Sequence, residues 1–173
     1  MTMKKVDVIL AIDPDCEKSG VAILNLRTKK MDMYNMPFPV LIDLITDLQL
    51  LVPDTLVIIE AGWLNEAHWH IRQGDSRRLS ASKGNAVGRN HETGRKIVEM
   101  CHHFGVHVEL VRPLKKVWSG ADRKITHEEI AQFIPGIVAR TNQEIRDAAL
   151  LAWHHAGFPI VVKPKQKGTQ CSK

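Results

Sequence analysis

The stretch "ILAIDPDCEKSGVAIL", residues 9 to 24, indicates two neighbouring strands with a carboxylate between them. Its first apolar run ends at Asp13, a polar turn covers residues 14 to 19, and a second apolar run begins at Val21. An isolated buried carboxylate is unfavourable, so it is normally paired, hydrogen-bonded or bound to a metal ion. Asp13 is therefore a candidate functional residue whose partners must come from elsewhere in the chain.

The rest of the chain predicts a mixed sheet covered by helices. Strand-like runs at 6–12, 20–26 and 30–36 have short connections, which predict an antiparallel meander. Helices and strands then alternate: a helix from Pro39 to Leu51, a strand at 56–59 ending at Glu60, a helix at 84–104, a strand at 106–111, and helices at 125–134 and 142–155. This order, β-β-β-α-β-α-β-α-α, predicts an α/β fold in which a mixed five-stranded sheet carries helices on both faces.

Two helix starts carry further expectations. Residues 61–83 are polar and basic, and we interpret them as a mobile loop or an irregular lead-in to the next helix. Gly84 and Gly88 are unfavourable inside a helix, so they indicate close approach of another helix or backbone, unless the helix begins later, near Asn90. Thr126 followed by Glu129 has the spacing of a capping box.

Length and composition indicate one globular domain. We expect the 173 residues to divide into a domain at 1–157 and a basic, flexible tail at 158–173. No apolar run approaches the roughly 18 residues of a membrane span, and the N-terminus lacks a secretory pattern, so we expect a cytoplasmic protein. Three widely spaced cysteines, Cys16, Cys101 and Cys171, favour reduced thiols over a disulfide framework or a structural zinc site.

The basic residues are clustered. The formal net charge is +5, and residues 72–96 hold seven Lys or Arg against two acids. Residues 112–124 hold five against Asp122, and the tail from Lys163 holds four lysines and no acid. Clusters of this kind suit a polyanionic partner, although a solvated basic surface would have the same composition.

Four carboxylates are placed to meet. Asp13 and Glu60 end two apolar strands, and both emerge at one edge of the sheet if these strands are parallel neighbours. Glu144 and Asp147, three apart, share one face of the last helix. Two ions of Mg²⁺, held by carboxylates, can activate a water and stabilise the leaving oxygen of a phosphodiester. Taken singly, each acid would more simply be a helix cap or a surface charge.

Five motifs in chain order resemble the RuvC family of Holliday-junction resolvases, within the RNase H-like superfamily. The resemblance covers roughly residues 6 to 157. The motifs are Ile12-Asp13-Pro14-Asp15 through Gly20, Glu60-Ala61-Gly62-Trp63, Lys83-Gly84-Asn85-Ala86-Val87-Gly88, the basic stretch from Arg112 to Lys124, and Glu144-Ile145-Arg146-Asp147-Ala148-Ala149.

The resemblance implies an RNase H-like fold and a crossover junction endodeoxyribonuclease. It implies a homodimer that cuts branched DNA. It also implies two Mg²⁺ ions per active site, for which Mn²⁺ could substitute, and it is compatible with a helicase-type partner protein. The implied catalytic and metal-binding residues are Asp13, Glu60, Glu144 and Asp147. The implied DNA-binding residues are Trp63, Arg77, Arg78, Lys83, Arg89, Lys115, Lys116 and Lys124. Trp63 would stack on unpaired bases, and Lys115, Lys116 and Lys124 would contact phosphate, one of them at the reacting group.

The chain departs from the family at three places. Asp15 stands where the family has Gly, which would add a ligand or a repulsive charge beside the site. Glu144 replaces a shorter Asp, and Ile145 and Arg146 fill the middle of the helical motif. These differences indicate a divergent, phage-type member.

Other function classes fit parts of the pattern. An RNase H-like nuclease acting on RNA or other branched nucleic acid needs the same acids, and a non-catalytic nucleic-acid-binding module needs only the fold and the charge. Half of an actin-like or sugar-kinase ATPase would also begin with a strand ending in Asp, but 173 residues leave no room for its second phosphate loop.

Overall fold

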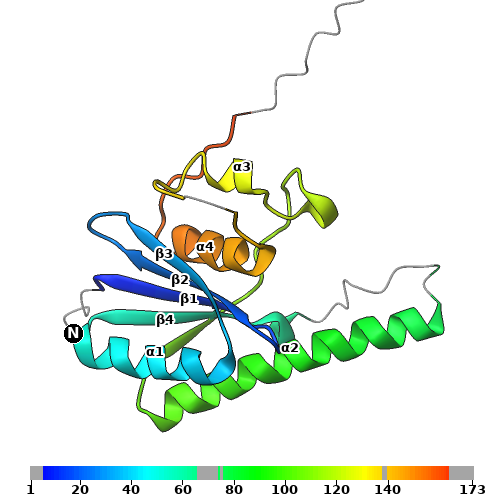
Figure 1. Ribbon diagram of the computed structural model, residues 1–173, viewed down its shortest axis with the longest axis horizontal. Coiled ribbons are helices and arrows are strands. Elements are labelled where there is room, and N and C mark those ends of the chain that lie inside the picture. Colours follow the sequence, from blue (N-terminus) through cyan, green and yellow to red (C-terminus); the bar gives the residue numbers. More distant parts are fainter. Residues whose placement is uncertain (1–5, 66–73, 75, 138–139, 164–173) are drawn as a thin grey trace, which may run out of the picture.

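The computed structural model describes residues 6–65, 74, 76–137 and 140–163, and its centre is a twisted sheet (Figure 1). Five strands lie in the order β3-β2-β1-β4-β5. They are β1 (Val8–Asp13), β2 (Ser19–Asn25), β3 (Met31–Met36), β4 (Thr55–Glu60) and β5 (Val108–Val111).

The sheet is mixed, as the sequence predicts. β1 pairs antiparallel with β2, and β2 with β3, which forms the meander. β4 lies parallel to β1 on its other side, and β5 lies parallel to β4. Parallel neighbours require crossover connections, which are provided by α1 (Phe38–Leu51) and α2 (Arg77–His103). The predicted order of elements and the mixed five-stranded sheet are confirmed.

Helices cover both faces of the sheet (Figure 1). On one face, Leu10 and Ile12 of β1 pack in a core cluster with residues of α1 and α2. On the other face, Ile9 and Ala11 pack with α4 (Gln143–His155). The short α3 (His127–Ile130) lies beyond α4. Side chains of a strand alternate between its faces, so the near-continuous apolar runs of β1 and β4 follow from burial on both sides.

The helix α4 approaches the sheet unusually closely. Asn142 caps the helix, since its Oδ1 accepts the Ile145 N–H at 3.0 Å. The small residues Ala148, Ala149 and Ala152 are fully buried. A Cβ placed on Gly20 of β2 would stand 2.0 Å from the carbonyl oxygen of Glu144, so only glycine fits there. The close packing brings the first turn of α4 to the end of β1.

The structure corrects the predicted start of the long helix. α2 begins at Arg77, capped by Ser76, whose side chain accepts the Leu79 N–H, so residues 77–83 are helical rather than loop. The residues of the predicted loop at 66–73 and 75 lie outside the described part. The first half of α2 extends past the edge of the sheet (Figure 1). Gly84 and Gly88 meet no close neighbour among the described residues.

Smaller differences concern the ends of elements. The predicted helix at 125–134 is regular only over α3, where the capping box of Thr126 and Glu129 is confirmed. The first residues of the predicted tail are packed: the Phe158 ring lies 4.8 Å from that of Trp153, measured between centroids. Residues 164–173, including Cys171, lie outside the described part, and Cys16 and Cys101 are free thiols. No helix among the described residues is long and apolar enough to cross a membrane.

Candidate active site

Two acids lie side by side at the ends of parallel strands. Ile12 of β1 pairs with Ile59 of β4, so the next residues, Asp13 and Glu60, end these strands at the same edge. By the alternation of the strands, both carboxylates point to the face covered by α4. The expectation that the two strands are parallel neighbours is confirmed.

Burial raises the pKa of three acids of the cluster, and neighbouring negative charges add to this effect at Asp13 and Glu60. The pKa of Asp13 lies well above its ordinary value because of burial, and then because of the negative charges of Glu60, Asp147 and Glu144. Burial and the charge of Asp147 raise the pKa of Glu60 from 4.5 to about 7. Burial also raises the pKa of Asp147. The other three predicted acids therefore all lie within electrostatic range of Asp13, and Asp147 also lies within range of Glu60.

Two lysines oppose these shifts. Lys124 lowers the pKa of Asp13, and with Lys116 it lowers the pKa of Glu60 and of Asp147. The sequence left open which of three lysines faces the site. The structure brings Lys116 and Lys124 into electrostatic range of the acids. Lys115 and Lys116 are exposed, and Lys124 is half-buried.

Asp147 is oriented by two residues that the sequence analysis did not select. Gln143 donates from Nε2 to the Asp147 Oδ1 at 2.7 Å, and Arg146 donates from Nη2 to the Gln143 Oε1 at 2.9 Å. The spacing of Gln143 and Asp147, one helical turn apart, is the signal that could have indicated this contact. Arg146 also donates to the carbonyl oxygens of Ile125 and Thr141.

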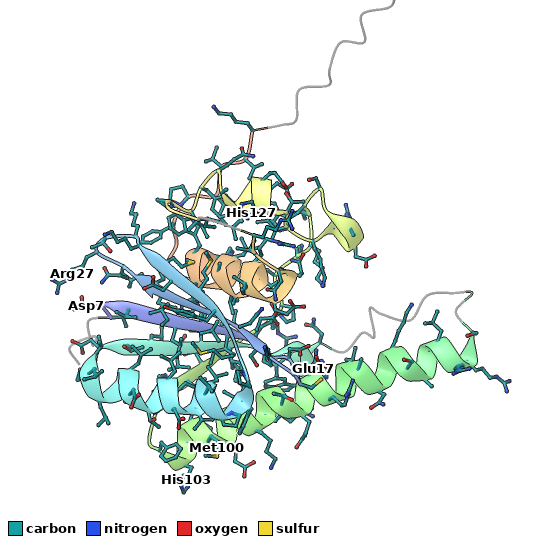
Figure 2. The ribbon with its side chains drawn as sticks, viewed as in Figure 1. Asp7, Glu17, Arg27, Met100, His103 and His127 are labelled. Atoms are coloured by element: carbon teal, nitrogen blue, oxygen red, sulfur yellow. The ribbon has the colours of Figure 1, made fainter. Side chains whose placement is uncertain are left out.

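The turn after β1 is tied to α2 through Asp15. The Asp15 Oδ1 accepts the Glu17 N–H at 2.8 Å, and its Oδ2 accepts from the Asn90 Nδ2 at 3.1 Å. Asn90 Oδ1 in turn accepts the Cys16 N–H at 3.1 Å. Figure 2 shows Glu17 of this turn beside α2, at the opposite end of the sheet from the ion pair of Asp7 and Arg27. Both oxygens of Asp15 thus serve to hold the turn.

Trp63 is packed rather than freely exposed. It lies in a short 3₁₀ turn, Gly62–Leu64, and its ring is partly buried against the cluster that includes Ile97. A Cβ on Gly94 would stand 2.4 Å from this ring, and the Arg95 guanidinium carbon lies 5.6 Å from a ring centroid of the indole. Its role in stacking on bases stays a prediction.

The remaining predicted DNA-binding residues lie along the projecting half of α2. Arg77, Arg78 and Arg89 are exposed, and Lys83 is half-buried. Arg89 and Glu144 line a shared surface pocket of about 410 Å³, so the basic helix and the carboxylate cluster border the same hollow.

The acids of the cluster are of the chemical type that binds divalent metal ions, although their side chains do not form a closed ligand set in the described part. No three Asp, Glu, His or Cys side chains in the described part converge as a ready-made metal site. The groups present are carboxylates, the hard oxygen ligands that Mg²⁺ prefers. Asp13, Glu60 and Asp147 are desolvated like charges, an arrangement that a bound cation stabilises.

Comparisons with known proteins find similar solved structures but no similar sequence. No protein-family model matches the chain, and no curated protein sequence gives a significant match. Among solved structures, T. thermophilus RuvC in complex with a Holliday junction substrate is 14% identical, with a TM-score of 0.47 over 86% of this chain and 92% of that chain. A second structure of Thermus thermophilus RuvC is 13% identical, with a TM-score of 0.48 over 86% of this chain and 93% of that one. Because these identities and TM-scores are low, they add no argument, and the fold is known from the order and direction of its strands.

Proposed function

We propose that this protein is a Mg²⁺-dependent endonuclease that cuts four-way or other branched DNA junctions by hydrolysing phosphodiester bonds. The observation that supports this best is the grouping of Asp13, Glu60 and Asp147, which are half-buried and lie within electrostatic range of Lys116 and Lys124. A cluster of mutually repelling carboxylates is costly to the fold, and cation binding compensates that cost. The five sequence motifs add the substrate class, since they resemble those of junction resolvases.

The acids would hold the metal ions, with Glu144 at the rim. Mg²⁺ bound there would supply an activated water and would stabilise the leaving oxygen of the phosphodiester. Lys124 and Lys116 place positive charge where negative charge develops on the reacting phosphate. Gln143 fixes the rotamer of Asp147, and the contact of Asp15 with Asn90 holds the turn beside Asp13.

The basic first half of α2 would bind the DNA backbone. Four basic residues follow one another along the helix towards the carboxylate cluster, namely Arg77, Arg78, Lys83 and Arg89. Contacts of this type position DNA without reading its sequence, and their strength falls steeply with salt. Binding at low salt should therefore be strong for any DNA, with selectivity for junctions determined nearer to the active site.

A homodimer would match the two-fold symmetry of a four-way junction. The first half of α2 projects beyond the sheet. Gly84 and Gly88 have no side chains and meet no described neighbour, so a second helix could approach closely there. Light scattering at micromolar concentration should give twice the mass of the chain. A fully active monomer would contradict both the dimer and the paired cuts.

The decisive experiment compares three substrates. A synthetic four-way junction, a linear duplex of the same sequence and an RNA–DNA hybrid are each incubated with wild-type protein and with Asp13→Asn, in Mg²⁺, Mn²⁺ or EDTA. We expect metal-dependent cutting of the junction by wild type alone. Cutting of the hybrid would instead indicate an RNase H-like activity, and binding without cutting a non-catalytic module.

A further inference from the structure

The segment that carries Lys124 has a constrained backbone. Between β5 and α3, Trp118 donates its N–H to the Arg123 carbonyl at 3.1 Å, and Gly120 donates to that of Lys124 at 3.0 Å. Asp122 and Arg123 both have positive φ, 51° and 59°, a conformation that side chains other than glycine seldom adopt. Consecutive strained residues persist only where surrounding contacts hold them.

One buried carboxylate supplies such contacts on both sides of Lys124. Glu129 of α3 is only 8% exposed. Its Oε1 accepts the Ser119 N–H and its Oε2 accepts the Thr126 N–H, each at 2.9 Å. These bonds outweigh the effect of burial and lower the pKa of Glu129. A carboxylate can accept both N–H groups, whereas an amide in the same place offers one acceptor and one donor.

A second tie joins the segment to the helix of the active site. Arg146 donates from Nε to the Ile125 carbonyl at 3.0 Å and from Nη2 to the Gln143 Oε1 at 2.9 Å. Gln143 holds the Asp147 carboxylate at 2.7 Å. The residue that follows Lys124 is thus linked through two side chains to a proposed metal ligand. Glu129 and Arg146 together fix the segment from Ser119 to Thr126 on both sides of Lys124.

We propose that Glu129 is a positioning residue, whose carboxylate holds residues 119–126 in the strained conformation that keeps Lys124 facing the carboxylate cluster, with Arg146 completing the link. The inference rests on the proposed nuclease function for its catalytic consequence. It assigns a role to a residue that touches neither the acids nor a substrate. It also explains Arg146, which departs from the family pattern, as a tie between α4 and the Lys124 segment.

The first test measures the segment without using activity. Glu129→Gln keeps the size of the side chain but removes one of its two acceptors, and Glu128→Gln removes the same charge from an exposed position on the same helix. Amide hydrogen exchange should accelerate about tenfold or more over residues 119–126 in Glu129→Gln alone, with the sheet still protected. Unchanged exchange in that segment would overturn the proposal. If Glu129→Gln fails to fold, Glu129→Asp, which is too short to reach both N–H groups, takes its place.

The second test asks whether Glu129 acts through Lys124. Under single-turnover conditions with saturating junction, Glu129→Gln should slow cutting on the order of tenfold while junction affinity stays at the wild-type level. In a Lys124→Ala background the same substitution should have no further effect, because the group it positions is gone. If the double variant instead loses the product of the two single-variant reductions in cutting rate, Glu129 has a general structural role and the proposal is overturned.

The two hypotheses fail in different ways. A wild-type protein that cuts none of the three substrates would overturn the proposed function, and with it the catalytic consequence of Glu129. An active wild type with equal rates for wild type and Glu129→Gln would overturn the positioning role alone.

Discussion

Replacing Glu60 by Gln should stabilise the metal-free protein at alkaline pH. Glu60 ends β4 beside Asp13 and Asp147, and its ionised form is disfavoured by burial and by the charge of Asp147. The substitution keeps the shape of the side chain and removes the charge. A variant that is more stable than wild type yet inactive would show that the fold tolerates this charge for the sake of cation binding.

The magnitude follows from the pKa of Glu60. A rise from 4.5 to about 7 corresponds to about 3 kcal/mol, at about 1.4 kcal/mol per pH unit. Because the folded state binds this proton more tightly than the unfolded state, the free energy of unfolding decreases as pH rises from about 4.5 through about 7. Above pH 7 the whole penalty is present, and below pH 4.5 none of it is. Wild type and Glu60→Gln should therefore differ at pH 8 and agree at pH 4.5.

The assay is urea unfolding in EDTA at both pH values, followed by circular dichroism. At pH 8 the variant should be more stable by up to about 3 kcal/mol, which for a chain of this size raises the melting temperature by about 6–12 °C. Addition of Mg²⁺ at pH 8 should raise the free energy of unfolding of wild type and should change that of the variant little. Asp47→Asn, a neutralised carboxylate exposed on α1, serves as the control and should show neither effect.

One result would refute this reasoning. If Glu60→Gln at pH 8 in EDTA is no more stable than wild type, then Glu60 is neither desolvated nor repelled as the structure indicates. A stabilisation equal at both pH values would also contradict it, because the gain would then come from packing rather than from charge.

Three further substitutions test the site and the packing around it. Asp13→Asn should reduce cutting by at least about a hundredfold while leaving junction binding near wild type, as measured by gel shift; retained cutting at saturating Mg²⁺ would remove Asp13 from the metal site. Trp63→Ala should lower stability by about 2–3 kcal/mol, because its ring packs on Gly94; an unchanged melt combined with a loss specific to junctions would instead support stacking on bases. Gly20→Ala should destabilise the fold by about 3 kcal/mol or more by pushing α4 away from β2. Its control, Gly84→Ala, should leave the monomer fold intact, because no described residue lies within 4 Å of the added Cβ.

The sequence by itself determined the elements and the positions of the acids. Apolar runs such as residues 8–12 and 56–59 are long enough for strands and too uniform for surface segments, so they predict buried strands directly. Asp13 and Glu60 interrupt these runs at their ends, and a helix repeat brings Glu144 and Asp147 to one face. Local chemistry also identified the capping box of Thr126 and Glu129, because both partners lie within one turn.

The start of α2 shows where a local pattern fails. Its first half makes little contact with the sheet, so residues 77–83 carry no apolar stripe from which a helix could be predicted. Ser76, as a helix cap, was the one local signal. Trp63 was interpreted from a motif, but packing against Gly94 depends on how α2 crosses the end of β4.

Only the tertiary structure decided which polar groups lie near the acids and which hold the surrounding backbone. Asp15 could have joined the acids, but the contact of Cys16 and Asn90, 74 positions apart, places α2 where it engages that carboxylate. Lys116 and Lys124 differ from Lys115 only through the path of a loop, and Glu129 and Arg146 hold that loop through hydrogen bonds from separate helices. Such contacts join residues whose spacing in the chain has no period, so they arise from the packing of α2, α3 and α4 and leave no pattern in the sequence.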